Sequence, residues 1–430
     1  EVLLLGPGRT PGCGVFQNVR ELLPGQYAVY ETQTARLTLH TYWRLEDHDH
    51  PDDFAATARR VRDLVTDAIE RQLVSDVPVA TFLSGGLDSS LISAIADAHF
   101  TAQGNQLQTF SVGYRDNKKY FHATKFQPGA DAPYIRKMND FLHARHHWVT
   151  LDTPELVPAL YAAVDARDLP GMADVDASLL VFCRHIKPHA TVALSGECAD
   201  EIFGGYPWYR DPTVRERYGF PWAQSTAYRA SSSSPVCWAA STRQRSWMKL
   251  SRHAGTDLRP PRPARRRTAD APDDEPEFQM VHADAAGPQG PHEHVQRPRG
   301  PRAVLRLPHC GVSLLGPMGV QGLSRAGKGP PARGHARRAA RRGSVAAQKP
   351  VPQNVEPSYL AAVSAELRTV LNDPAAPLLR IIRADALETL LASGADNPIP
   401  WYGQLMTTPQ TIAWFLQLNY WLAKYKVELV

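Results

Sequence analysis

Apolar residues follow two different periods along the first half of the chain. Compact apolar runs of strand length occupy residues 77–83, 107–114, 147–151 and 191–194. Between these runs, apolar residues recur every three or four positions, as at Leu91, Ile92 and Ile95, which is the spacing of one helix face. Strands that alternate with helices predict an α/β fold built on a parallel sheet.

The two ends of the chain have their own patterns. Residues 1–45 combine Gly/Pro turns with strand-like runs and predict the β-rich end of a preceding domain. Residues 54–73 have helical spacing and lead into the first strand of the sheet. Near the C-terminus, Thr408 and Pro409 form a typical helix start ahead of a strongly apolar segment, which predicts a packed helix.

Residues 231–350 interrupt this order. The stretch is rich in Arg, Pro, Ala and Gly, and it holds 21 of the 48 Lys and Arg residues but 8 of the 43 Asp and Glu residues. Such a composition predicts disorder and accounts for the net charge of +5, because the remainder of the chain is acidic. The sequence thus divides into four predicted parts: residues 1–45, 54–230, 231–356 and 357–430.

Bulk properties narrow the classes of protein. A chain of 430 residues with 43% hydrophobic content is long enough for two domains with sizeable cores. No apolar run reaches the length of about 20 residues that spans a bilayer, and the segment after Glu1 lacks the basic start of a signal peptide. The five cysteines are few and far apart, which favours reduced thiols. We therefore expect a cytoplasmic protein without a membrane partner.

Residues 84–90, Ser-Gly-Gly-Leu-Asp-Ser-Ser, join the first predicted strand of the sheet to a helix. A loop at this place offers backbone N–H groups and the helix dipole to an anion, and glycines allow close approach of a phosphate. Asp88 is a candidate ligand of Mg²⁺. Ser-Gly-Gly alone favours a plain turn with capping serines, but the heptapeptide in this context favours phosphate binding. The candidate contacts are Ser84, Gly85, Gly86, Asp88, Ser89 and Ser90.

A second motif, Ser-Gly-Glu-Cys-Ala-Asp-Glu-Ile-Phe-Gly-Gly-Tyr, follows the predicted strand 191–194. Loops after neighbouring parallel strands meet at one edge of the sheet, so both motifs should face one site. Asp200 is a candidate second metal or pyrophosphate contact, and Glu197 a candidate for positioning an attacking amine. The plainer interpretation is an acidic helix start stabilised by the dipole.

Residues 84–90 resemble the pyrophosphate loop of the ATP pyrophosphatase superfamily, whose members split ATP to adenylate a substrate. Together, both motifs resemble the synthetase domain of glutamine-dependent asparagine synthetases, and residues 171–178 are similar to the segment before the second motif there. The resemblance covers most of residues 1–230 and 357–430. It implies an adenine nucleotide alpha hydrolase-like fold, with the β-rich end of a glutaminase domain in front. It also implies that the nucleotide site includes Leu83, Val112, Ser195 and Gly196, and that Glu197 serves the adenylate intermediate.

Two departures from that family are visible. Its glutaminase activity requires an N-terminal cysteine nucleophile, whereas this chain begins at Glu1 and Cys13 lies in a Gly/Pro turn. We therefore expect the chain as given to use free ammonia rather than to hydrolyse glutamine. The other departure is the basic stretch, which stands where the family has a helical domain and a catalytic lysine.

A change of reading frame would explain the basic stretch. Reading the codons one base late gives residues compatible with the family at 297–310 and at 325–333, and the family's catalytic lysine then falls at Lys328. Near residues 231–238 the opposite shift fits better, so more than one insertion or deletion is implied. The alternatives are a genuine disordered insertion, such as a nucleic-acid-binding arm, and Lys328 as a solvated charge.

These observations predict an ATP- and Mg²⁺-dependent ligase that amidates aspartate through a β-aspartyl adenylate, with catalysis by positioning and charge neutralisation. Its expected partners are aspartate, ATP and ammonia or glutamine, with no nucleic acid, and a homodimer is left open. One alternative is another adenylating amide former, such as a β-lactam synthetase or a peptide cyclase. The other is an inactive product of a decayed gene.

Overall fold

The computed structural model describes residue 12 and residues 14–44, 50–121, 129–206, 226–234, 303–307, 312–316, 356–395, 400–402 and 406–428. These residues belong to two compact units. The first unit comprises Glu1–His50, Trp222–Pro288 and Val370–Thr408, and the second comprises Pro51–Pro221, Gln289–Thr369 and Pro409–Val430. The four domain boundaries expected from the sequence stay predictions.

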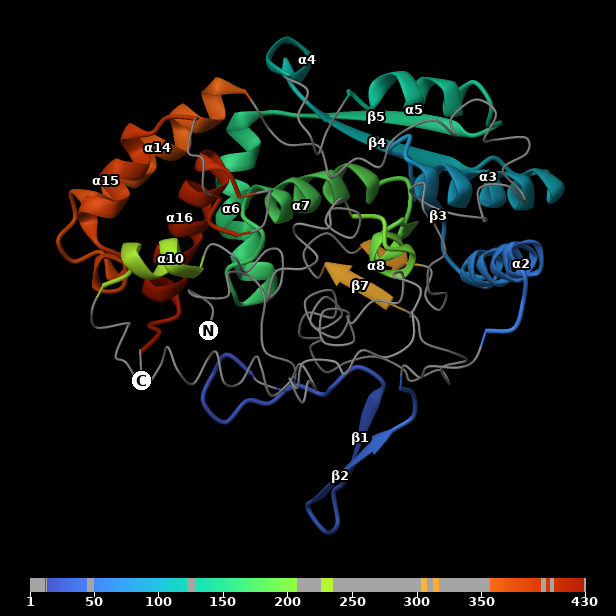
Figure 1. Cartoon of the computed structure of the whole chain (residues 1–430), viewed down its shortest axis with the longest axis horizontal. Helices are drawn as coiled ribbons and strands as arrows, with labels where there is room; N and C mark the ends of the chain where they lie inside the picture. Colours follow the sequence, from blue (N-terminus) through green and yellow to red (C-terminus); the bar gives the residue numbers. More distant parts are fainter. Residues whose placement is uncertain are drawn as a thin grey trace, which may run out of the picture. The chain divides into compact units, whose positions relative to one another are not determined.

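The second unit is built on a six-stranded sheet in the order β5-β4-β3-β6-β8-β7, of which Figure 1 labels β3, β4, β5 and β7. Its strands are β3 (Val79–Phe82), β4 (Gln108–Tyr114), β5 (Arg145–Leu151), β6 (Val192–Leu194), β7 (Ala303–Leu307) and β8 (Val312–Gly316). All neighbours are parallel except β7 and β8. The chain moves outward from β3 to β5 and returns on the other side at β6, so the strand order reverses between β3 and β6. The predicted α/β fold with a parallel sheet is confirmed.

Strands β7 and β8 lie inside the stretch for which composition predicts disorder. Their backbones pair antiparallel from Ala303↔Gly316 to Leu307↔Val312, and β8 extends the parallel sheet beside β6. For these ten residues the prediction of disorder is wrong. Composition averaged over 120 residues hides two short apolar runs, and a free edge at β6 supplies the backbone partners that such runs need.

Helices cover the sheet, and local signals explain several of their limits. They are α2 (Phe54–Gln72), α3 (Leu87–Ala102), α4 (Asn117–Tyr120), α5 (Ala132–Asn139), α6 (Thr153–Arg167), α7 (Asp174–Ile186) and α8 (Ala199–Phe203). Asp53 caps α2 by accepting from Ala56 N at 2.7 Å. Asp152 and Glu155 form a capping box at the start of α6. The buried face of α2 packs with α3 and the sheet in one core that contains Ile69, Ile92, Leu107 and Leu194.

The C-terminal part is helical, as the sequence indicates. It contains α14 (Pro357–Leu371), the 3-10 turn η5 (Pro377–Arg380), α15 (Ala384–Ala392) and α16 (Thr408–Lys424). In α16, every residue from Thr411 to Leu418 is buried, and this long, mostly apolar surface lies against α6 of the same unit. Among the described residues, no helix is both long and apolar enough to cross a membrane.

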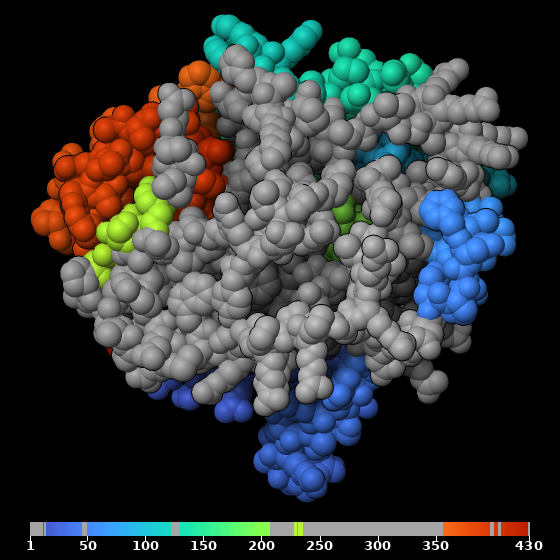
Figure 2. Space-filling view, viewed as in Figure 1, coloured from blue at the N-terminus to red at the C-terminus, as the bar shows by residue number. Residues whose placement is uncertain are grey.

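The described residues of the first unit include a β-hairpin and a short helix, α10 (Thr226–Ser232). In the hairpin, β1 (Gln26–Glu31) pairs antiparallel with β2 (Arg36–Thr41), and most of its side chains are exposed (blue in Figure 2). Its existence confirms the two strand-like runs near the N-terminus. Directly after α10, Ser233 forms an isolated antiparallel bridge with Ile382 of the same unit.

Candidate functional site

The two sequence motifs meet where the strand order reverses. Strands β3 and β6 are hydrogen-bonded neighbours, with Val79 beside Val192 and Thr81 beside Leu194, so the loops that follow them leave the same edge of the sheet. A Cβ placed on Gly196 would lie 3.0 Å from Asp88 Cβ. The two loops are therefore in contact, as predicted.

Gly85 fixes the path of the first loop. Its φ angle of +75° belongs to the left-handed region, and a Cβ at this position would lie 2.8 Å from both Ile135 N and Tyr134 Cβ of α5. A side chain is therefore excluded by conformation and by space. The tight turn brings the backbone directly onto the N-terminus of α3, where Gly86 stands at the N-cap without a capping side chain.

The serines of the first loop have different surroundings. Ser84 Oγ and Ser89 Oγ lie 2.9 Å apart, and Ser84 N donates to Ser89 Oγ at 3.1 Å. These contacts hold the loop closed on the first turn of α3. Ser90 Oγ is buried and has no hydrogen-bond partner in the described part of the chain. An orphaned hydroxyl at a helix N-terminus fits a phosphate oxygen as its partner.

The neighbouring strand supports the same loop. Leu83 is fully buried, its N–H donates to Phe110 O at 2.8 Å, and its carbonyl accepts from Ser111 Oγ. Val112 follows on β4 and is half-buried. Leu83, directly after β3, and Val112 on the adjacent strand β4 thus lie at the loop's side of the sheet, which is compatible with their expected place beside a nucleotide.

The second loop is a tight turn that ends in a short helix. Ser195 is buried and its Oγ accepts from Glu197 N at 3.2 Å. Cys198 takes a left-handed φ of +66° before α8, which carries Asp200 in its first turn. Tyr206 donates from its hydroxyl to Glu201 Oε1 at 2.6 Å. The turn therefore brings several carboxylates together within a few residues.

Glu197 has the electrostatics of a group that exchanges protons near neutral pH. Loss of hydration raises its pKa to about 7, and the negative charges of Glu201 and Asp176 act in the same direction. By surface area its side chain is exposed to solvent, as a carboxylate that meets a substrate requires. Burial also raises the pKa of the Cys198 thiol to about 12, with Glu201 and Glu197 adding to the effect, so this cysteine stays protonated.

Asp176 is a member of the site that sequence reasoning missed. It comes from the start of α7, accepts from Arg167 Nη1 at 2.6 Å and from Met172 N at 2.9 Å, and its charge acts on Glu197. Residues 171–178 resemble a family segment, but nothing in their pattern distinguishes Asp174 from Asp176. The distinction depends on the electrostatic effect of Asp176 on Glu197 in the folded chain.

Asp88 and Asp200 stand on the two loops that touch at Gly196. No group of three or more His, Cys, Asp or Glu side chains suited to a metal occurs among the described residues. Two carboxylates are nevertheless a donor set that Mg²⁺ accepts, because it completes its shell with phosphate and water oxygens. Lys328 and Cys13 lie outside the described residues.

Comparison with known proteins gives the family. The family described as asparagine synthase matches residues 60–342, about two thirds of the chain. Asparagine synthetase [glutamine-hydrolyzing] 3 of Bacillus subtilis (strain 168) is 36% identical over 467 residues, which cover all of this chain and 70% of that protein. Amidase chry2 of Gibberella zeae is 32% identical in a match that covers 48% of this chain and about a third (32%) of that protein.

Among solved structures, NAD+ synthetase from Burkholderia pseudomallei matches 36% of this chain and 66% of its own, with 18% identity and a TM-score of 0.22. A score at this level adds nothing to the fold seen directly in the sheet. The assignment depends on the family match to about two thirds of the residues and on the 36% identity to the Bacillus subtilis protein along the whole chain. By both of these findings, the chain belongs to the asparagine synthase family.

Proposed function

We propose that this chain is an ATP-dependent ligase that forms asparagine from aspartate and ammonia through a β-aspartyl adenylate. The observation that carries the proposal is the contact between the two motif loops at the β3–β6 switch point. An open α/β sheet binds its ligand at this place, and here the binding loop for phosphate and the carboxylate-rich loop are both present.

The first half-reaction is adenylation. The β-carboxylate of aspartate attacks the α-phosphorus of ATP, the bond to the β-phosphate breaks, and pyrophosphate leaves. The loop 84–90 and the α3 N-terminus supply N–H groups and a positive dipole end to the phosphates, and Ser90 adds its hydroxyl. Leu83, Val112, Ser195 and Gly196 are assigned to the walls of the nucleotide site.

Mg²⁺ would be held by Asp88 and Asp200, and it would supply positive charge to the phosphate oxygens. In this arrangement, Asp88 belongs to the first turn of α3 and Asp200 to the first turn of α8. The two carboxylates thus approach the phosphates from two loops. Neutralising the pyrophosphate makes it a better leaving group.

The second half-reaction is aminolysis. Ammonia attacks the acyl carbon of the adenylate, AMP leaves with the bonding electrons, and one proton must be removed from the nitrogen. Glu197 is assigned to that proton, because a carboxylate with a pKa of about 7 is ionised about half of the time at neutral pH. If the family's lysine is retained, Lys328 is its place in this chain. The source of ammonia, free or from glutamine, is left to the experiment.

Two substitutions separate the half-reactions. Aspartate-dependent exchange of labelled pyrophosphate into ATP measures adenylation alone, and asparagine release measures both steps. Asp88→Asn should abolish exchange and synthesis. Glu197→Gln should keep most of the exchange and lower asparagine formation roughly 10²- to 10⁴-fold, the usual contribution of a general base. Asp67→Asn, an exposed carboxylate on α2, is the matched control and should change neither rate.

The outcomes also separate the alternatives. Exchange that requires a carboxylate other than aspartate would identify another amide-forming ligase. A purified chain that shows no exchange with aspartate or with other carboxylates would favour the decayed-gene hypothesis. If Glu197→Gln lost exchange as completely as synthesis, the assignment of Glu197 to aminolysis would be wrong.

A further inference from the structure

Helix α5 packs directly against the loop 84–90, although it belongs to neither motif. A Cβ on Gly85 would lie 2.8 Å from Ile135 N and from Tyr134 Cβ, and 3.0 Å from the carbonyl carbon of Tyr134. The first turn of α5 therefore fills the space beside Gly85 with backbone atoms. Backbone in a packed helix cannot move aside as the end of a flexible side chain can, so this neighbour limits the path of the loop.

The contact is steric and is not a further phosphate site. A backbone N–H could bind phosphate, but Ile135 N donates to Asp131 O at 3.1 Å, and Tyr134 N donates to the same oxygen at 2.9 Å. The N–H groups at the contact with Gly85 are thus used within the first turn of α5. What the helix contributes to the loop is its position.

The same helix packs on both elements that flank the loop. Ile135 and Met138, with exposures of 2% and 0%, share one core with Leu83, the residue directly before the loop. Ala94 of α3 packs against this core. The end of β3, the loop and the helix that follows it therefore all contact α5, and a shift of α5 would disturb the loop from two sides.

The segment after α5 is fixed to the sheet layer by hydrogen bonds of its own. Asp97 is buried on α3, and its Oδ2 accepts from His143 N at 3.1 Å. The carbonyl of His143 accepts from Gln106 Nε2 at 2.9 Å. Asp97 lies about 15 Å along α3 from Leu87, the first residue of that helix. The far end of α5 is therefore held by contacts distant from the loop.

The sequence of the loop explains why such a support matters. Ser84 and Ser89 join the loop to the first turn of α3, with 2.9 Å between their Oγ atoms, and Ser89 Oγ donates to Gly86 O at 3.3 Å. Gly85 lies between these bonded residues and faces α5. Two adjacent glycines are highly flexible, and a loop that must become ordered when its ligand arrives binds more weakly than one that is already ordered.

We propose that α5 is the support that keeps the loop 84–90 in its phosphate-binding conformation, and that Ile135 and Asp97 are positioning residues for the outer phosphates of ATP. Ile135 acts through Leu83 and Gly85, and Asp97 acts through His143. Neither residue touches substrate in this scheme. The inference deepens the proposed function and rests on it, since it presumes that this loop holds the pyrophosphate part of ATP.

The test compares two ligands that differ in the outer phosphates. Isothermal titration calorimetry on the purified chain measures the dissociation constants of MgATP and of AMP. In Ile135→Ala the packing between α5 and Leu83 is lost, so MgATP should bind roughly tenfold more weakly because the loop is less ordered. AMP lacks the outer phosphates and should bind as before. Asp97→Ala frees the far end of α5 and should weaken MgATP binding in the same way, to a smaller extent.

Each variant has a matched control elsewhere in the same unit. Ile69 on α2 is also 2% exposed but belongs to a different core, so Ile69→Ala should lower the melting temperature about as much as Ile135→Ala. Asp53 also accepts from a backbone N–H, that of Ala56 at 2.7 Å, and Asp53→Ala is the control for Asp97→Ala. Both controls should keep the wild-type ratio of the two dissociation constants.

A less severe pair of substitutions covers a failure to fold. If Ile135→Ala does not fold, Ile135→Val and Ile69→Val replace the first variant and its control. Folded Ile135 and Asp97 variants with the wild-type ratio of dissociation constants would overturn the proposal. An equal change of that ratio in the control variants would overturn it as well, because general loss of stability would then be the cause.

Aspartate-dependent pyrophosphate exchange tests the proposed function separately. Ratios that change as described in a chain without exchange activity would support the role of α5 and count against asparagine synthesis. Normal exchange with unchanged ratios would do the reverse. A wild-type chain that binds MgATP no more tightly than AMP would overturn both claims.

Discussion

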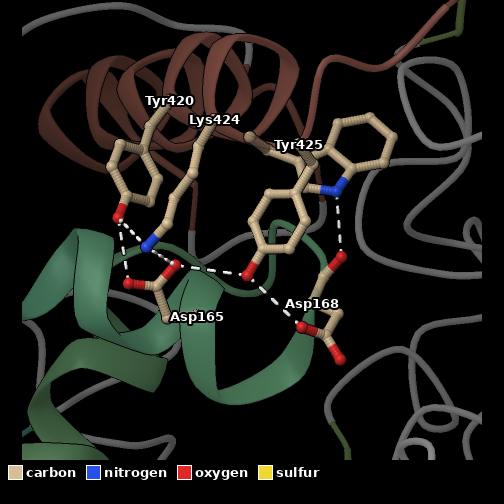
Figure 3. Close-up of polar contacts among 6 residues, drawn as sticks. Asp165, Asp168, Tyr420, Lys424 and Tyr425 are labelled. Carbon is tan, nitrogen blue, oxygen red and sulfur yellow. Dashed lines mark hydrogen bonds and ion pairs between the residues drawn. The ribbon is translucent and has the colours of Figure 1, made fainter.

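The two ends of helix α16 each bind an aspartate, one of them buried and the other partly exposed. At its start, Gln410 binds Asp174 in the interior. At its end, Lys424 Nζ lies 2.7 Å from Asp165 Oδ1 at the surface of α6, and the hydroxyls of Tyr420 and Tyr425 donate to the same carboxylate (Figure 3). One helix thus combines a buried contact, in which a carboxylate loses its hydration, with a partly exposed contact, in which the carboxylate keeps much of it.

The pKa values of the two carboxyls move in opposite directions. Burial raises the pKa of Asp174 to about 6, and the hydrogen bond from Gln410 opposes this only in part. Partial burial also acts to raise the pKa of Asp165, but the hydrogen bonds from Lys424 and Tyr420 outweigh it, and the pKa is lowered. Acidification should therefore remove the cost of a buried charge at Asp174. It should weaken the ion pair and the hydrogen bonds that stabilise the ionised Asp165.

The largest expected effect is that of Asp174→Asn on the pH dependence of stability. The folded pKa of about 6 lies above the usual value for an aspartate, so the wild-type chain loses stability as pH rises from about 4 through 6. This rise in pKa corresponds to at most about 3 kcal/mol. Asp174→Asn should lack this loss, and urea unfolding at pH 4.5, 6 and 8 measures the difference. Parallel curves for both proteins would contradict a raised pKa.

Gln410→Leu removes the donor of the buried hydrogen bond to Asp174. Asp174 then loses its donor while it remains in the interior, so we expect a loss of about 2 kcal/mol in the free energy of unfolding at pH 8. The loss should shrink at pH 4.5, where Asp174 is protonated and can itself donate. Urea unfolding at the two pH values measures this, and an equal loss at both would mean that the charge of Asp174 is unimportant.

Ala173 precedes α7 with a φ of +50° and a ψ of −119°, a strained conformation for a residue with a Cβ. Ala173→Gly tests whether the hydrogen bond between Gln410 and Asp174 maintains this strain. Relief of the backbone is worth about 1–3 kcal/mol and the added flexibility of glycine in the unfolded chain costs about 0.5–1, so we expect a net gain of about 1 kcal/mol. Combined with Gln410→Leu, it should reduce the penalty of that substitution in a double-mutant cycle. Additive effects would show that the hydrogen bond and the turn are independent.

Lys424→Met should have the smallest effect. Lys424 is about half exposed, and such ion pairs contribute little and are screened by salt. We expect a slightly lower melting temperature at low ionic strength and no difference from the wild-type chain at roughly 0.5 M salt. A large loss of stability that does not depend on salt would show that the Lys424 ion pair contributes as a buried contact does, which would contradict its exposure.

The two motif loops were predictable because their signals are local. An apolar strand, a glycine turn and a helical period within twenty residues define the first loop, and the structure places β3 and α3 around it with limits close to the expected ones. The second motif is recognised in the same way after β6. Gly85 illustrates the agreement, because its left-handed φ explains why glycine stands at that position.

Only the tertiary structure decided which contacts form between segments far apart in the sequence. The sequence determined that a loop rich in glycine and serine and a loop rich in carboxylates follow strands of the sheet, since side-chain period and turn chemistry act over a few residues. It did not determine that β7 and β8 complete the sheet, that the charge of Asp176 acts on Glu197, or that Gln410 donates to Asp174. Those contacts join residues far apart in the chain, and their energies depend on burial and on partners that exist only once the chain has folded.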